Sequence, residues 1–287
     1  MRYQPIIHHP PASKDPEMTQ DAPRIDTLAT LSGKAPWRLG LQHSRDTHLL
    51  IWITRGQGRA IVAGQRKGMG INNMLFIPAG TLFSVDPGPQ GFGLAMVVPP
   101  GAGIPLPEGN HHLRIRDVHA QQELTALVEA MQREQSGSRD FHAAAARAHA
   151  TLIAIWLKRA LLAAPGPAET SAEARIATAF TDLVAREFHS GQSTATYAEK
   201  LGITPTHLAR CLNTTAGMSA AAILTECSLH AARSLLCDTD HPVGRISEYL
   251  GFGSAAYFTR FMQQHTGKTP SGLRDAETTG AGAVSHT

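Results

Sequence analysis

Two arginines occupy matching places in the C-terminal third of the chain. Arg210 and Arg260 each lie a few residues after a glycine-containing turn, and each is the only charged side chain in the centre of its segment. A guanidinium group donates two parallel hydrogen bonds to a planar pair of acceptors, such as O6 and N7 of guanine, or binds a phosphate. Taken singly, either arginine would be interpreted as a solvated surface charge. Their repeated setting makes them candidates for base or phosphate recognition.

The same pattern of helix, turn and helix surrounds both arginines. In the first copy, residues 196–201 form a short predicted helix ending at Gly202, and Thr204-Pro205 provides an N-cap and a favourable first helical residue. In the second copy, 49 residues later, residues 245–250 end at Gly251, and Ser254 caps the next helix. This pattern is typical of a helix-turn-helix, whose second helix enters the major groove of DNA. A single copy would leave two packed structural helices as an open alternative.

The segment between the two copies is predicted to be one rigid helix. Residues 219–237 have a continuous helical pattern over 19 residues. At 1.5 Å per residue this helix is about 28 Å long, and successive major-groove faces of B-DNA are roughly 34 Å apart. A helix of this length would allow one chain to place two recognition helices on the same side of a duplex.

The amino-acid sequences of both copies resemble those of a known family. Residues 246–261, followed by Gly267-Lys268-Thr269-Pro270 and Arg274, resemble the signature of the AraC/XylS transcription regulators. The first copy shares Leu201-Gly202-Ile203, Leu208-Ala209-Arg210 and Gly217-Met218-Ser219 with the family, and the connecting helix shares Leu229, Ala232, Leu235 and Leu236. The resemblance covers residues 175–275. One departure is Ser228, because the family often has an arginine there that could form a salt bridge or contact a phosphate.

The resemblance implies which residues contact DNA. The outward faces of the two recognition helices carry Thr206, Ala209 and Arg210 in the first unit, and Ala255, Ala256, Thr259 and Arg260 in the second. Alanine and threonine methyl groups can pack on a thymine methyl, but the two alanines offer no hydrogen bonds. His207 is interpreted either as a phosphate contact or as solvent-exposed. The same two readings stay open for Lys200, Arg233, Lys268 and Arg274.

The N-terminal part of the chain has a β pattern from Trp37 to about His119. Short apolar segments at 48–54, 59–63, 74–77, 81–85 and 92–98 are separated by Gly and Pro turns, which predicts a small barrel or sandwich. The expected fold class is therefore α+β, with an all-α C-terminal part. The Gly56-Gln57-Gly58 hairpin and the segment 76–81 resemble the cupin-like sensor domain of many AraC-type regulators. That resemblance implies a small-molecule effector.

Cupins are also metalloenzymes, so an enzyme with a helical appendage is the rival hypothesis. The offsets of the usual cupin metal ligands fall on Gln42, Ser44, Leu49 and Phe83, none of which is an expected ligand. The sequence thus predicts no metal, no cofactor and no catalytic residues. A regulator with a vestigial barrel that serves only to dimerise is a third reading.

Six residues are candidates for an effector site. His43, Arg45 and His48 could line its mouth, and an apolar pocket would use Trp52, Phe76 and Phe83. The competing interpretation is that the histidines lie on the surface and the aromatic residues form the barrel core.

Helical periodicity begins after residue 117 and predicts a helical hairpin over 120–163. One stripe of its second helix holds Phe141, Ala145, Ala148, Leu152, Ile155 and Leu162. This stripe is a candidate homodimer surface, and packing on the chain's own barrel is the alternative. The remaining expected boundaries are a disordered lead at 1–35 with a possible docking stretch at 25–31, a sensor domain at 36–119, a linker at 164–174, the DNA-binding domain at 175–275 and a disordered tail at 276–287.

Composition constrains the number of domains and the distribution of charge but does not by itself indicate a function. The 287 residues carry a net charge of +3, and about two domains are expected at roughly 100–200 residues each. Residues 37–163 hold 13 basic and 8 acidic side chains, whereas 164–275 hold 9 and 10. Net charge alone would therefore indicate the wrong half as the DNA-binding one. The expected partners are double-stranded promoter DNA, an effector, a second copy of the chain and RNA polymerase.

The cysteines and the absence of long apolar runs indicate the cellular compartment. Cys211, Cys227 and Cys237 have neither CxxC nor metal-ligand spacing. Cys227 and Cys237 would lie about 15 Å apart on one helix, too far for a disulfide. Three buried thiols, no apolar signal core and no membrane span predict a cytoplasmic protein.

Overall fold

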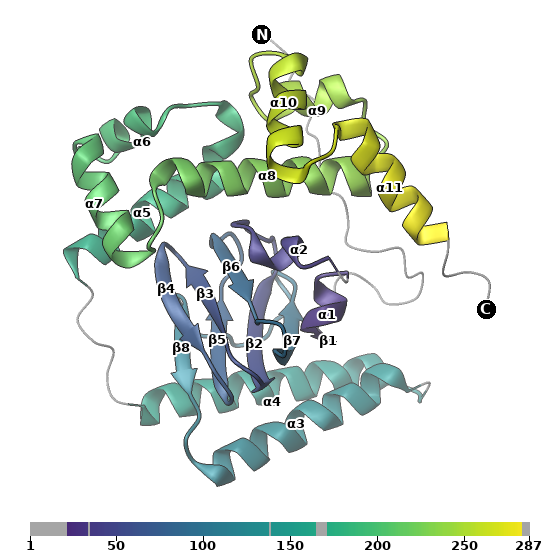
Figure 1. Ribbon diagram of the computed structural model, residues 1–287. Helices are drawn as coiled ribbons and strands as arrows, with labels where there is room; N and C mark the ends of the chain where they lie inside the picture. The colour runs from purple at the N-terminus through teal and green to yellow at the C-terminus, as the bar shows by residue number, and fades with distance from the viewer. Residues whose placement is uncertain (1–21, 34, 138, 165–170, 283–287) are drawn as a thin grey trace.

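The computed structural model describes residues 22–33, 35–137, 139–164 and 171–282 (Figure 1). The described N-terminal residues form two antiparallel sheets with a helical hairpin below them, and the C-terminal residues form an all-helical layer above. These parts are called the sheet region (22–163) and the helical region (171–282). The predicted division into a sheet-rich N-terminal part and a helical C-terminal part is confirmed.

Eight strands make up the two sheets. The five-stranded sheet has the order β1 (Arg24–Thr27), β7 (Phe92–Val98), β2 (His48–Arg55), β5 (Asn73–Ile77) and β8 (His111–Arg114). The three-stranded sheet has the order β4 (Gln65–Met69), β3 (Gly58–Val62) and β6 (Phe83–Asp86). The sequence predicted β2, β3, β5, β6 and β7 but missed β1, β4 and β8, and it extended the β pattern over Trp37–Gly40, which is the short helix α2.

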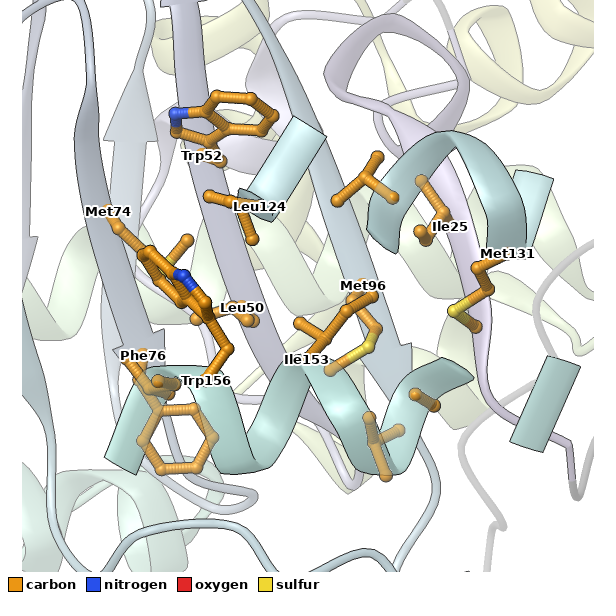
Figure 2. Close-up of a cluster of buried hydrophobic side chains, with 14 of the residues drawn as sticks. Ile25, Leu50, Trp52, Met74, Phe76, Met96, Leu124, Met131, Ile153 and Trp156 are labelled. Atoms are coloured by element: carbon orange, nitrogen blue, oxygen red, sulfur yellow. The ribbon is translucent and has the colours of Figure 1, made fainter. Parts of the chain in front are cut away.

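The central strands are buried on both faces. In β2, Leu49, Ile51 and Ile53 point into the space between the two sheets, while Leu50 and Trp52 point to the opposite side. This follows from the two-residue repeat of an extended strand. The inner core joins both sheets, and the outer core joins the five-stranded sheet to the helical hairpin (Figure 2).

The hairpin consists of α3 (Val118–Ser136) and α4 (His142–Ala163). The side chain of Asp117 caps α3 by accepting a hydrogen bond from the backbone of Ala120. Buried residues on both helices contact the outer face of the sheet: Leu124, Val128, Met131, Ala146, Ala150, Ile153, Trp156 and Leu157.

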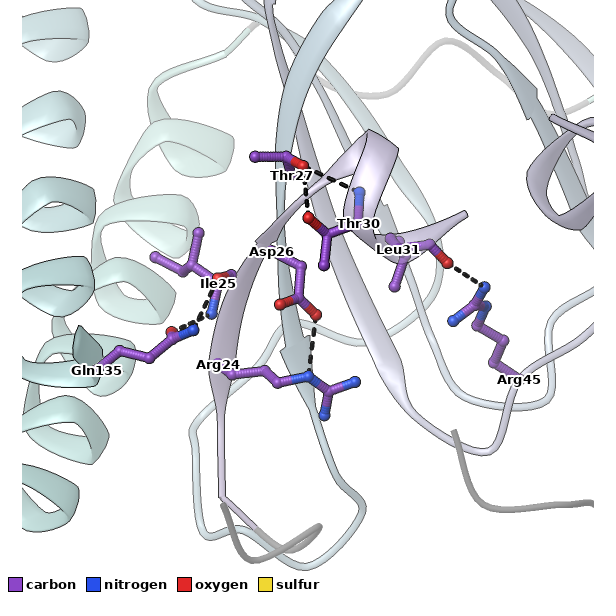
Figure 3. Close-up of polar contacts among 8 residues, drawn as sticks. All are labelled: Arg24, Ile25, Asp26, Thr27, Thr30, Leu31, Arg45 and Gln135. Carbon is purple, nitrogen blue, oxygen red and sulfur yellow. Dashed lines mark hydrogen bonds and ion pairs between the residues drawn. The ribbon is translucent and has the colours of Figure 1, made fainter. Parts of the chain in front are cut away.

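The prediction that residues 1–35 are disordered is wrong for the part that follows residue 21. Residues 24–27 form edge strand β1, which pairs with β7, and 28–31 form the short helix α1. The side-chain amide of Gln135 binds both backbone groups of Ile25, at 2.8 Å and 3.0 Å (Figure 3). Buried Ile25, Leu28 and Leu31 anchor this segment through contacts distant in the sequence, which local composition does not reveal. The expected docking stretch at 25–31 is therefore docked, and residues 1–21 lie outside the described residues.

The helical region begins before residue 175 and ends after residue 275, the boundaries that the sequence predicted for the DNA-binding domain. It consists of α5 (Ala172–Glu187), η1 (Phe188–Ser190), α6 (Thr194–Lys200), α7 (Pro205–Thr215), α8 (Ala220–Asp238), α9 (Val243–Tyr249), α10 (Ala255–Thr266) and α11 (Pro270–Gly282). Helix α11 covers residues 276–282, which were predicted to be disordered. Most of the predicted linker, at 165–170, lies outside the described residues.

Helix α8 lies between the two layers (Figure 1). Leu82 of the sheet region is part of the core formed by α5, α6, α7 and α8, and Leu41 packs against the core formed by α8, α9, α10 and α11. The hydroxyl of Thr178 on α5 donates to the carbonyl of Ala63 at 3.2 Å. The sheet region thus contacts both halves of the helical region.

Candidate nucleic-acid interface

The first helix-turn-helix unit is built by local caps. The hydroxyl of Ser193 accepts from the backbone of Thr196 at the start of α6, and the hydroxyl of Thr204 accepts from that of His207 at the start of α7. Gly202 lies between these helices with φ of 68°, a left-handed conformation that glycine adopts without strain. Pro205 occupies the first turn of α7. The sequence pattern predicted the Gly202 turn, the Thr204 cap and Pro205. It did not predict the Ser193 cap, and it began the first helix at residue 196 rather than at Thr194.

The second unit repeats the arrangement with a longer turn. The hydroxyl of Ser254 caps α10 by accepting from the backbone of Tyr257. Gly251 has φ of 74°, and a Cβ at this position would lie 2.6 Å from the carbonyl oxygen of His189. The turn therefore requires glycine both for its conformation and for the close approach of η1. Phe252 packs against Phe258 and Phe261 with both ring-centroid distances at 5.0 Å.

The two recognition helices, α7 and α10, present equivalent faces. Arg210 and Arg260 are both exposed, as are Thr206, Ala255 and Ala256. Ala209, His207 and Thr259 are half-buried. Leu208, Leu212, Phe258 and Met262 lie on the opposite sides of these helices, in the core. The predicted base-reading residues therefore share one side of their helices.

Sequence reasoning missed further polar residues on these faces. Asn213 and Gln263 are exposed and lie three residues after Arg210 and Arg260, so helical spacing places each on the same face as its arginine. Asparagine and glutamine amides bind the N6 and N7 edge of adenine. Tyr257, which is 53% exposed, is a further addition on α10. The i+3 spacing from each arginine was the signal that could have found the two amides.

The predicted phosphate contacts divide into exposed and engaged side chains. Lys268 is exposed just after α10. Lys200 forms an ion pair with Glu187, and hydrogen bonding from Lys200 lowers the pKa of that carboxyl. Arg274 donates to the carbonyl oxygens of Leu236 and His241, at 3.2 Å and 2.6 Å, and so holds the C-terminal end of α8.

Arg233 lies elsewhere than predicted. Its guanidinium stacks on the ring of Trp37 in the sheet region, 4.3 Å from the ring centroid. In this conformation it is part of the contact between the two regions rather than of the recognition face. Sequence spacing alone could not identify this partner, because Trp37 is almost 200 residues away.

The predicted effector residues fall on different sides of the five-stranded sheet. His43 and Phe83 contact each other, with ring centroids 4.3 Å apart, and Arg45 donates to His43. Trp52 and Phe76 belong to the outer core, and His48 stacks on Phe76 at 6.2 Å. The six residues therefore do not line one pocket, because alternation along the strands separates them. A cavity of about 10 Å³ beside Trp52 has room for roughly one water molecule.

The positions of the usual cupin metal ligands have other roles. The buried Gln42 amide donates to the hydroxyl of Ser84 at 2.7 Å, and the backbone of Phe83 pairs with that of His43. Among the described residues there is no group of three or more His, Cys, Asp or Glu side chains that could hold a metal ion.

Two further sequence expectations concern the cysteines and the membrane. Cys211 and Cys227 are buried and Cys237 is half-buried, and all three are free thiols. Burial raises the pKa of Cys211 and of Cys227. None of the helices in the part of the chain that the structure describes is long and apolar enough to cross a membrane.

Comparison with known proteins gives one sequence match and several structural likenesses. Residues 197–276 match a family described as a helix-turn-helix domain. A comparison with curated protein sequences finds no match. The C-terminal domain of AraT, a response regulator from Geobacillus stearothermophilus, is 24% identical, with 38% of this chain and 88% of that chain covered and a TM-score of 0.34.

Two other solved structures show likenesses of the same order. ToxT from Vibrio cholerae is 10% identical over 88% of this chain and 97% of its own, with a TM-score of 0.38. The DNA-binding domain of AdpA, a global transcriptional factor solved in complex with a target DNA, is 20% identical over 34% of this chain and 91% of its own, with a TM-score of 0.32.

The sequence match and the geometry of the two units define the C-terminal region as a helix-turn-helix DNA-binding domain. Its two capped recognition helices are connected through the single helix α8.

Proposed function

We propose that the chain is a DNA-binding transcription regulator of the AraC/XylS type, and that it recognises its operator by inserting α7 and α10 into two successive major grooves on one side of the duplex. The observation that carries this proposal is the equivalent exposed face of the two helices, each with an arginine followed three residues later by an amide. Arginine reads guanine and an amide reads adenine through two hydrogen bonds each. Both units therefore carry side chains that can recognise bases. This favours an operator with two recognition elements about one helical turn of DNA apart.

The connecting helix supports this geometry. Helix α8 has 19 residues, so it is about 28 Å long, whereas successive major-groove faces are roughly 34 Å apart. The two distances are similar enough for both recognition helices to bind one face of a modestly deformed duplex. Because the helical region has no excess of basic side chains, its sequence-independent affinity should be modest.

Mapping of bound sites tests this function. Chromatin of the source organism is crosslinked and sequenced with the tagged chain, and a recovered site is then footprinted with the purified protein. We expect protection of two base-pair clusters whose centres are about 10 base pairs apart, on one face of the DNA. Protection of a single cluster, or binding without sequence preference, would contradict the two-groove proposal.

The effector, the RNA polymerase contact and cytoplasmic localisation belong to the same proposal. A regulator that acts on promoters must share a compartment with the chromosome and with the polymerase. An effector changes DNA binding only if it binds one arrangement of the sheet and helical regions better than another. Bound operators would also indicate the effector, since the adjacent genes reveal the pathway under control.

A homodimer is proposed through the exposed stripe of α4. Phe141, Leu152 and Leu162 are 85%, 46% and 87% exposed, and Ala148 is exposed between them. With the half-buried Ala145 and Ile155, positions 141 to 155 recur at spacings of four and three, and Leu162 follows seven residues later, as along the seam of a coiled coil. The opposite side of α4 packs on the sheet, so the stripe remains available to a second copy.

Charged substitutions in this stripe should separate the dimer. In the Leu152→Glu/Leu162→Glu variant, two like charges would meet across a two-fold interface, and we expect a monomer by size-exclusion chromatography with light scattering. The matched control is Lys158→Glu/Arg147→Glu, which changes exposed charged positions of the same helix. A wild-type chain that is monomeric at micromolar concentration, or an undisturbed dimer in the leucine variant, would refute this interface.

A further inference from the structure

One face of α8 is held by the short segment that follows α1. Arg38 of α2 donates to both carboxylate oxygens of Asp238, at 2.7 Å and 2.6 Å. The backbone N–H of Gln42 donates to the carboxylate of Glu226 at 3.1 Å. Glu226 and Asp238 lie twelve residues apart, so the sheet region contacts the C-terminal two-thirds of α8.

An aromatic cluster fills the middle of this contact. The ring of Trp37 lies between the guanidinium groups of Arg233 and Arg38, with 4.3 Å and 4.7 Å to its centroid. His230 of α8 approaches the edge of Trp37 at 5.5 Å and donates to the carbonyl oxygen of Arg38 at 3.2 Å. The histidine therefore packs against a ring that already binds two guanidinium groups.

His230 also stacks on a second histidine from the sheet region. Its ring is 4.2 Å from that of buried His43, and the two planes are inclined by only 10°. His43 Nδ1 is 2.9 Å from the carbonyl oxygen of Leu41, and its Nε2 is 3.3 Å from Nε of Arg45. A carbonyl only accepts and an arginine only donates. His43 must therefore carry its proton on Nδ1 and use Nε2 as an acceptor, which requires a neutral ring.

The charged groups around the pair do not stabilise a positive ring. Arg45 beside His43, Arg38 on α2 and Arg233 on α8 are cations. Asp238 and Glu226 on α8 are bound to Arg38 and to the backbone of Gln42, while Asp46 and Asp26 act on Arg45. Burial lowers the pKa of His43 well below its usual value, and the charges of His230 and Arg45 add to this effect. Burial also raises the pKa of Glu226.

We propose that the contact made by Trp37, Arg38, Gln42 and His43 with Glu226, His230, Arg233 and Asp238 is an acid-released latch between the sheet region and α8. Protonation of His43 removes the acceptor for Arg45 and puts a buried imidazolium against the ring of His230, beside the cation of Arg45. Release frees this face of α8, the helix that connects the two recognition units, while Leu82 and Thr178 still join the sheet region to the first unit.

Low pH favours the released state, because His43 binds a proton more weakly when it is docked than when it is exposed. An exposed His43 has an ordinary pKa of about 6.5, whereas the docked one has a lower pKa. The released state therefore binds more protons below pH 6.5. The stabilisation of the docked state by the neutral His43 is fully present above that pH and is lost as the pH falls toward the docked pKa. From pH 7.5 to pH 5.5 the equilibrium constant for release should rise about tenfold, because pH 5.5 lies one unit below the pKa of an exposed histidine.

The fluorescence of Trp37 in the full-length chain tests the latch. Acrylamide quenching is measured at pH 7.5 and 5.5, and the Trp37→Phe variant is subtracted to remove the signals of Trp52 and Trp156. We expect Trp37 to become several times more accessible at pH 5.5. In His43→Gln, an uncharged amide can still donate to Leu41 and accept from Arg45, so the accessibility of Trp37 should be low and unchanged at both values of pH.

A matched control and a second variant complete the test. His119→Gln replaces an exposed histidine of α3 and should keep the full pH response. If His43→Gln does not fold, as judged by circular dichroism at pH 7.5, His230→Gln is used, and its pH response should be smaller than that of the wild type. An unchanged wild-type signal between the two values of pH, or a full response in the variant that folds, would overturn the latch.

Discussion

Replacing Arg210 or Arg260 by alanine is expected to weaken operator binding by about 1–3 kcal/mol, or roughly five- to a hundredfold, because each loses a two-hydrogen-bond contact with a base. Both side chains are exposed on the faces of α7 and α10 that point away from the core. Their loss should therefore leave the free energy of unfolding almost unchanged. Fluorescence anisotropy with a footprinted operator fragment measures the effect.

Controls distinguish base reading from simple charge. Lysine at position 210 or 260 keeps the charge but lacks the planar fork, so it should restore general DNA binding without discrimination between operator and mutated operator. Arg147→Ala removes the same charge from exposed α4 and should not change affinity. Unaltered affinity in both recognition-helix alanine variants would mean that these arginines do not contact DNA.

The second large effect is expected at Leu82, where alanine should lower the free energy of unfolding by about 2–5 kcal/mol, as for other large-to-small core substitutions. Leu82 belongs to the sheet region, yet it is 1% exposed and contributes to the core that also contains Phe180, Tyr197 and Leu208. The cavity would therefore open at the junction between the sheet region and the first helix-turn-helix unit.

Denaturant unfolding measures the decrease in the free energy of unfolding, and hydrogen exchange shows which elements it affects. We expect amides of α5 and α7 to exchange faster in the Leu82→Ala variant, although the substitution lies in the other region. Ile71→Ala, at a position that is 55% exposed, is the control and should cost little. If only the strands near Leu82 lost protection, the shared core would not stabilise the recognition unit.

The recognition machinery was predictable from sequence because it depends on neighbours along the chain. Thr204, Pro205 and Ser254 act on helices that begin at the next residues, and Gly202 and Gly251 set the turns by their own conformation. The exposed arginines then follow from helical periodicity. The same reasoning could have found Asn213 and Gln263, which share that periodicity.

The predictions that failed depend on contacts between distant segments. Residues 22–31 continue a segment that has no periodic pattern, and pairing with β7 and the amide of Gln135 holds them as a strand and a helix. Arg233 has the spacing of a phosphate contact, but Trp37 holds it at the sheet region. The six effector candidates are separated because alternate residues of a strand point to opposite faces.

What the sequence determined by itself is thus the pair of helix-turn-helix units that we propose to contact DNA: two capped second helices, each with an outward arginine, connected through one long helix. Only the tertiary structure decided how the N-terminal half is joined to that machinery, through Leu82, Leu41 and the histidine stack on α8. Caps, turns and helical faces are set by residues a few positions apart, whereas docking of one region on another depends on side chains nearly 200 residues apart that no local pattern relates.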